Sequence, residues 1–139
     1  EGPEEKRLKN LAKTKKVNHI VHIYGRVDSV LERLQHFSIF LNISLSESFG
    51  LAVGEAMAVG LPVVASDIDT LEWLVTKECG VFVNPPSPDD IAPKIEKLLL
   101  DKTLRTKLGR AGKKRIAAHF TEQAMVDKTV PVYKQLLSK

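Results

Sequence analysis

The chain has 139 residues, of which 43% are hydrophobic and 27% charged, and it carries a net charge of +4 at pH 7. These values are typical of one folded domain, here residues 1–139, and they exclude a wholly disordered chain. No apolar stretch approaches the about 20 residues that a membrane-spanning helix needs, and the opening sequence EGPEEKRLKN lacks the apolar segment of a signal peptide. We therefore expect a cytoplasmic protein.

Cysteine and histidine offer little for a metal or redox site. Cys79 is the only cysteine, which excludes an internal disulfide and a zinc site built from several thiolates. His19 and His22 lie three residues apart in a predicted strand, so their side chains would point to opposite faces. We expect no metal site from these residues.

Short runs of β-branched residues alternate with helical stretches, a pattern typical of βαβ units around a parallel sheet. The predicted strands cover residues 19–24, 38–43, 62–65 and 80–83. The predicted helices cover residues 3–16, a segment that opens at Ser29, residues 51–59, 69–75, 88–100 and 102–119, and a last segment after Thr121.

Caps and turn residues predict where some of these helices begin. Ser29 and Glu32 have the spacing of a capping box. Ser87 followed by Pro88 is a strong helix start, because serine caps a helix well and proline fits its first position. A turn with the sequence Asn-Pro-Pro is predicted just before it, at residues 84–86.

The later helices carry two further predictions. Pro93 and Pro131 lie inside predicted helices and should kink or shorten them. The last helix has apolar residues at positions i, i+4, i+7 and i+11, namely Val126, Val130, Tyr133 and Leu137. This spacing predicts that the last helix packs its apolar face against the rest of the chain.

The most informative stretch runs from Ser44 to Asp67 and reads SLSESFGLAVGEAMAVGLPVVASD. In a parallel α/β sheet ligands bind beyond the carboxyl ends of the strands, where the loop over residues 44–50 is expected. Gly50 lets backbone N–H groups approach an anion at the start of the next helix. Glu47 and Glu55 could face one cleft and accept hydrogen bonds from a vicinal diol, or they could be surface or capping residues.

The combination of residues is more specific than the two glutamates alone. Residues 47–58, ESFGLAVGEAMA, resemble the Glu-x7-Glu motif of the retaining glycosyltransferases of family 4, and residues 60–67, GLPVVASD, resemble the strand that follows it. Residues 24–27, YGRV, are similar to the family's strand and glycine turn beside the nucleotide base. The resemblance extends over nearly the whole chain. It implies the C-terminal half of the GT-B fold, an α/β, Rossmann-like parallel sheet with flanking helices, here without its first two strands.

The resemblance implies a site for a UDP- or GDP-linked sugar donor, with no bound metal and no other cofactor. Glu47 would be the catalytic residue, in contact with hydroxyls of the transferred sugar, and Glu55 would bind the ribose diol. The implied donor-binding set is Glu47, Ser48, Phe49, Gly50, Leu51 and Glu55, in which backbone amides face the sugar and the diphosphate. Gly25, Arg26 and Val27 would lie beside the base.

Several positions depart from the family's pattern. Ile43 and Ser48 stand where the family often has Pro and Gly. Asp-Thr at residues 69–70 replaces a Gly-Gly pair, and Glu-Trp at residues 72–73 replaces a Pro-Glu pair. We interpret Trp73 as a packing residue rather than a surface on which a ligand stacks.

Asp67 and Asp69 form an Asp-x-Asp pair of the kind that other glycosyltransferases use to hold a metal. Acids two residues apart are common, and this pair falls at a strand end and a helix start. We therefore interpret it as structural.

A part of the family's fold has no counterpart in this sequence. The missing pieces are the acceptor-binding N-terminal domain and the basic residues that contact the diphosphate. In the strand order 3-2-1-4-5-6, residues 19–24 would be the third strand and would not pair directly with residues 38–43. We expect the 139 residues to be part of a longer enzyme and the isolated chain to be inactive.

Basic residues are concentrated in one predicted helix. Seven basic residues and no acid occur there: Lys102, Arg105, Lys107, Arg110, Lys113, Lys114 and Arg115. A solvated helix face is one explanation, and peripheral contact with an anionic membrane or a phosphorylated acceptor is the other. Nucleic acid is not expected as a partner, because no aromatic residues interleave with these charges.

Two functions of different classes remain open. The first is the donor-binding domain of a retaining glycosyltransferase that moves a hexose from a nucleotide sugar to a lipid-linked or saccharide acceptor. The alternative is a nucleotide-sugar-binding module without catalysis. A third function, a basic protein that binds membranes or nucleic acid, rests on the basic helix alone.

Overall fold

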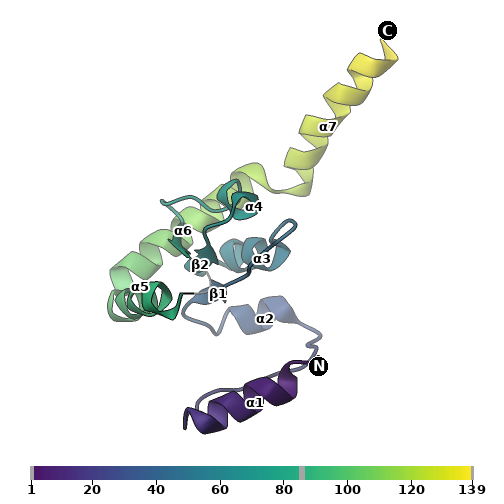
Figure 1. Ribbon diagram of the computed structural model, residues 1–139. Helices are drawn as coiled ribbons and strands as arrows, with labels where there is room; N and C mark the ends of the chain where they lie inside the picture. The colour runs from purple at the N-terminus through teal and green to yellow at the C-terminus, as the bar shows by residue number, and fades with distance from the viewer. Residues whose placement is uncertain (1, 85–86, 139) are drawn as a thin grey trace. The chain divides into compact units, whose positions relative to one another are not determined.

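The computed structural model describes residues 2–84 and 87–138, which form two units, residues 1–30 and residues 31–139. We call them the N-terminal unit and the C-terminal unit. The turn predicted at residues 84–86 lies in part outside the described residues. Figure 1 shows the elements in chain order.

The N-terminal unit contains α1 (Glu5–Thr14), in which Ala12 is the buried residue. A turn follows, where the backbone N–H groups of Ile20 and Val21 both donate to the carbonyl of Val17, each at 3.0 Å. Residues 21–27 have no regular secondary structure and belong to no strand. The strand predicted at residues 19–24 is therefore wrong. A β-strand needs a hydrogen-bonded neighbour, and the sheet of the described residues includes none of this segment.

The C-terminal unit is built on a three-stranded parallel sheet in the order β1 (Phe40–Asn42), β2 (Val63–Ser66), β3 (Gly80–Val83). Every residue of the central strand β2 is buried, as expected for a parallel strand covered on both faces. The prediction of a parallel α/β sheet with strands in these three places is confirmed.

Helices cover both faces of this sheet. The helices after α1 are α2 (Val30–Leu34), α3 (Leu51–Val59), α4 (Asp69–Glu72), α5 (Pro88–Leu100), α6 (Lys102–His119) and α7 (Glu122–Leu137). Of these, α3, α5 and α6 pack on the strands. Alternate residues of β2 enter different clusters: Val63 packs with Val53 and Met57 of α3, while Val64 packs with Leu98 of α5 and Leu108 of α6. This alternation follows from the period of two along a strand.

The helix starts predicted at Ser87 and after Thr121 are confirmed, and Asp101 is a further cap that was not predicted. Ser87 stands at the N-cap of α5 with Pro88 first in the helix, but the Ser87 side chain makes no capping hydrogen bond. Asp101 caps α6, because its carboxylate accepts the backbone N–H of Leu104 at 2.8 Å. Thr121 caps α7 by accepting the N–H of Ala124 at 3.1 Å.

The prediction that the last helix packs against the chain is wrong. None of the described residues of α7 is buried, and Leu137 at its end is 88% exposed. The apolar spacing is present, but no other element of the described chain covers that face. Figure 1 shows α7 running on from the end of α6, away from the sheet.

The two internal prolines do not shorten their helices. Pro93 lies inside α5 and Pro131 inside α7, and each helix continues on both sides of its proline. A proline removes one backbone donor, and helices of 13 and 16 residues keep their other hydrogen bonds. Within the described residues, no helix is both long and apolar enough to cross a membrane.

Candidate functional site

The candidate site lies where β1 and β2 end and α3 begins. Asn42 is the last residue of β1 and Ser66 the last of β2. The carboxyl ends of parallel strands share one edge of a sheet, and the loop over residues 43–50 leaves β1 at that edge. The predicted loop therefore occupies the expected place.

Glu47 is held by a short network of polar side chains. Asn42 Nδ2 donates to Glu47 Oε2 at 3.5 Å, and Ser44 Oγ donates to Asn42 Oδ1 at 3.1 Å. The hydroxyl of the buried Ser66 donates to the Asn42 carbonyl at 3.5 Å. These contacts orient a half-buried carboxylate toward the end of the sheet. Sequence reasoning missed Asn42, although a polar residue ending a predicted buried strand is the signal that could have found it.

Gly50 opens helix α3 in a conformation that few other residues adopt. Its φ of 80° lies in the left-handed region, and a Cβ there would stand 2.6 Å from Leu71 Cδ2. No side chain caps α3, and its first turn holds no acid. The first N–H groups of a helix have no partner within it, so this end of α3 is suited to an anion.

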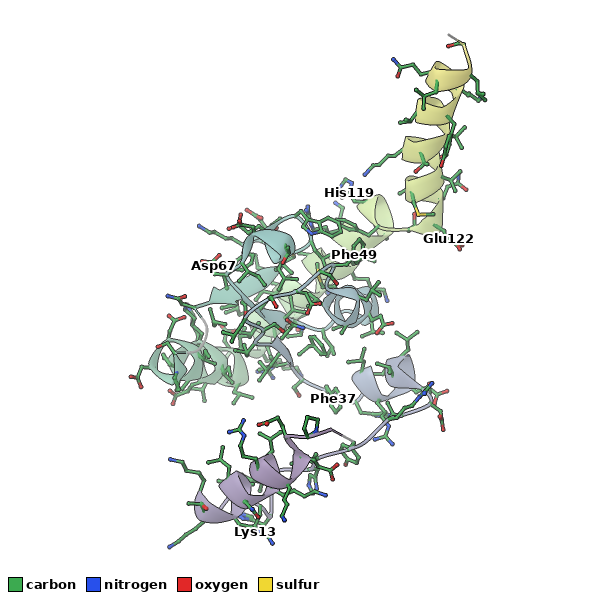
Figure 2. The ribbon with its side chains drawn as sticks, turned by 45° about the vertical axis from the view of Figure 1, so that its right-hand side comes forward. Lys13, Phe37, Phe49, Asp67, His119 and Glu122 are labelled. Carbon is green, nitrogen blue, oxygen red and sulfur yellow. The ribbon has the colours of Figure 1, made fainter. Side chains whose placement is uncertain are left out.

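Glu55 lies exposed on α3 and lines a cleft of about 890 Å³. Phe49, Leu51 and Gly54 line the same cleft. The opposite wall comes from the junction of α6 and α7, including Arg115, Ile116, His119, Phe120, Glu122, Met125 and Lys128. Figure 2 shows Phe49 near this junction, where His119 and Glu122 are labelled.

The predicted donor set is thus only in part gathered in one cleft. Phe49, Leu51 and Glu55 line it together, and the buried Gly50 connects them. Glu47 belongs to the same loop but faces Asn42. Ser48 is exposed on that loop.

An aromatic row forms one side of the cleft. The rings of Phe49 and Trp73 meet edge to face with centroids 4.8 Å apart, and Trp73 meets Phe120 in the same way at 5.0 Å. The guanidinium carbon of Arg115 lies 5.5 Å from the centre of the Phe120 ring. Such pairs stabilise packing beyond the area they bury. Trp73 therefore packs between two rings, while its 40% exposed side chain also lines the cleft, and whether a ligand stacks on it stays a prediction.

The residues predicted to lie beside a base belong to the N-terminal unit. Gly25 and Arg26 are exposed and Val27 is half-buried, all in the irregular segment before α2. Their role stays a prediction.

The basic helix contains two kinds of cation. Arg105 and Arg115 turn inward: Arg105 donates to the carbonyls of Leu98 and Leu99, and Arg115 to those of Trp73 and Leu74. The others are exposed on α6, namely Lys102, Lys107, Arg110, Lys113 and Lys114. Among the described residues no group of three or more His, Cys, Asp or Glu side chains is placed to hold a metal ion, and Asp69 is the first residue of α4.

Comparison with known proteins identifies the family. Residues 1–115 match the family described as Glycosyl transferases group 1, and the chain belongs to that family. It is 29% identical to the lipopolysaccharide core biosynthesis glycosyltransferase LpsE of Rhizobium meliloti, a match covering 99% of this chain and 40% of that protein. It is 32% identical to the MMP alpha-(1->4)-mannosyltransferase of Mycolicibacterium hassiacum, a match covering 99% of this chain and 34% of that protein.

Solved structures support the fold. Sucrose-phosphate synthase from Thermosynechococcus elongatus is similar with a TM-score of 0.89 and 28% identity, over 99% of this chain and 35% of that one. Anabaena HepE, solved in complex with UDP, is similar with a TM-score of 0.85 and 20% identity, over 96% of this chain and 36% of that one. The fold is that of part of the C-terminal domain of a GT-B glycosyltransferase. The chain spans less than half the length of the relatives it matches.

Proposed function

We propose that this chain supplies the donor site of a retaining glycosyltransferase. The whole enzyme would move a hexose from a UDP- or GDP-linked sugar to a lipid-linked or saccharide acceptor. Membership of the Glycosyl transferases group 1 family supports the transferase class. The relative in Mycolicibacterium hassiacum is named as a mannosyltransferase, which favours a hexose.

The observation that carries the proposal is the uncapped start of α3 behind the left-handed Gly50. In the proposal the backbone amides of Phe49, Gly50 and Leu51 face the sugar and the diphosphate. When the bond from sugar to diphosphate breaks, negative charge grows on the leaving nucleoside diphosphate. Amides fixed by a helix start stabilise that charge without reorganising, so the proposal needs no bound metal.

Two carboxylates have separate roles in the proposal. Glu55 is exposed in the cleft and accepts the two hydroxyls of a ribose. Glu47 contacts hydroxyls of the transferred sugar, and the bond from Asn42 keeps its carboxylate oriented for that contact. Ser48 adds a hydroxyl on the same loop.

The remaining parts of the proposal lie outside this cleft. Gly25, Arg26 and Val27 bind the base. The enzyme works in the cytoplasm, and the exposed cations of α6 attract an anionic membrane surface where the acceptor is a lipid.

The test is a titration of the folded chain with UDP, GDP and ADP, in which ligand-observed NMR detects binding. We expect one of UDP or GDP to bind. Glu55→Gln should weaken it about tenfold, because hydrogen bonds to a charged group are worth about 1.5–3 kcal/mol. Glu122→Gln is the matched control, since Glu122 is an exposed glutamate on the same cleft, and it should bind normally. Equal binding by Glu55→Gln, or no binding by the folded chain, contradicts the proposal.

A further inference from the structure

Arg115 fastens helix α6 to the segment that follows α4. Its Nε donates to the carbonyl of Leu74 at 2.9 Å and its Nη2 to the carbonyl of Trp73 at 2.6 Å. Trp73 is the C-cap of the four-residue helix α4 and Leu74 follows it, so both carbonyls lie just beyond the end of that helix. A guanidinium is a rigid fork of donors, and charge-assisted bonds are stronger than neutral ones. Arg115 thereby fixes the position of this segment on α6.

The fastened segment in turn touches the loop that opens α3. The Trp73 ring meets the Phe49 ring at 4.8 Å. The buried side chain of Leu74 ends 3.3 Å from the point where Gly50 would carry a Cβ, and Leu71 ends 2.6 Å from it. The Phe49–Gly50 backbone therefore lies against a wall whose place is set by Arg115.

The loop has few other restraints on that side. Leu45, Ser48 and Leu51 are exposed, and no side chain caps α3. Phe120 supports the far side of the Trp73 ring at 5.0 Å and lies beside Arg115. Side-chain contacts therefore run without a break from α6 through Trp73 to Phe49.

We propose that Arg115 is a positioning residue for the donor-binding loop and acts through Trp73 and Leu74. The ligand in this inference rests on the proposed function, whereas the mechanical link from Arg115 to Gly50 does not. Arg115 touches no substrate in this account. It holds the Phe49 and Gly50 amides where a diphosphate can use them.

The first arm of the test needs no ligand. Arg115→Met keeps most of the side-chain stem and removes the guanidinium. Arg105→Met is the matched control, because Arg105 also bonds two carbonyls from α6, but at the end of α5. We expect Arg115→Met to move the Phe49 and Gly50 amide resonances and to shift the emission of Trp73, the chain's single tryptophan. Arg105→Met should change neither.

The second arm measures the affinity for UDP and GDP at a temperature where all variants are folded. We expect Arg115→Met to raise the Kd about tenfold, Arg105→Met to leave it unchanged, and Arg115→Lys, with one compact donor group, to fall between. Should Arg115→Met not fold, Arg115→Lys provides the same comparison with smaller shifts.

The two arms separate the two ways of failing. Unmoved Phe49 and Gly50 amides in a folded Arg115→Met variant overturn the positioning role, whatever binds. If the Phe49 and Gly50 amide resonances move in Arg115→Met but the unsubstituted chain binds neither UDP nor GDP, the positioning role stands and the proposed function is contradicted.

Discussion

Helices α3 and α7 show how one kind of sequence pattern leads to opposite structures. Each contains one of the chain's two methionines. Met57 in α3 is completely buried, whereas Met125 in α7 is 61% exposed. Both helices are rich in apolar residues, but only α3 has a sheet and a second helix to pack against. The comparison teaches that the apolar residues of a helix do not by themselves predict whether another element covers them.

The two methionines give the largest expected contrast. Met57→Ala should lower the free energy of unfolding by about 3 kcal/mol, because it removes a buried side chain and leaves a cavity. Met125→Ala should change it by less than about 0.5 kcal/mol, as at other exposed positions. Chemical denaturation of both variants measures the difference. Equal losses would show that α7 is packed in solution.

Two glycines on α6 test how tightly it meets α3. A Cβ on Gly109 would stand 2.0 Å from the Gly60 carbonyl oxygen, so Gly109→Ala should cost about 2 kcal/mol of stability. A Cβ on Gly112 would meet Met57 at an ordinary 3.5 Å. Gly112→Ala should therefore be neutral, or stabilising by up to about 1 kcal/mol from its better helix propensity. Thermal melts rank the two variants, and a destabilised Gly112→Ala with an intact Gly109→Ala would refute this packing.

Removing each of the two side-chain caps should affect a packed helix, α6, differently from an exposed helix, α7. Asp101→Ala removes the cap of α6 and should lower the stability of the whole unit by about 1 kcal/mol. Thr121→Ala removes the cap of α7 at a similar local cost. Because none of the described residues of α7 is buried, that cost should appear as faster amide exchange within α7 and not as a lower melting temperature. A lower melting temperature for Thr121→Ala would mean that α7 folds together with the sheet.

The smallest expected effect is a pH dependence at the start of α5. Hydrogen bonds from the Lys94 ammonium and from the Asn84 N–H, both at 2.8 Å, hold the pKa of Asp90 below its usual 3.8. A lowered pKa in the folded state means that this stabilisation is complete above about pH 4 and is lost as the pH falls through the lowered value. Chemical denaturation between pH 2 and 6 should show that the free energy of unfolding falls less in acid for Asp90→Asn than for the unsubstituted chain. If Asp90→Asn loses as much stability in acid as the unsubstituted chain, Asp90 does not contribute to the pH dependence of the free energy of unfolding.

Most of the C-terminal unit could be predicted from local patterns. The helix at Leu51–Val59, the strand at Gly80–Val83 and the helix at Lys102–His119 have the predicted bounds. The first of these helices ends at Gly60, the strand begins at Gly80 and Asp101 caps the second helix, so local signals set these bounds. The segment at residues 19–24 has a strand pattern but no hydrogen-bonding neighbour in the described chain, so β propensity alone could not decide its structure.

The candidate site was predictable in its position but not in its contacts. The loop and Gly50 follow from the strand, the glycine and the helix start. The bond from Asn42 to Glu47 and the link from Arg115 to Trp73 join residues whose meeting depends on side-chain packing. Arg115 belonged to a run of basic residues, and charge alone could not separate it from the exposed Lys113 and Lys114.

The most direct test of the donor site is a map of backbone amide shifts as UDP or GDP is added to the folded chain. We expect saturable shifts that are largest at Phe49, Gly50 and Leu51, at the start of α3. The exposed cations Lys107 and Arg110 on α6 offer the competing anion site. Saturable shifts centred on α6, with the α3 amides unmoved, would contradict the central claim.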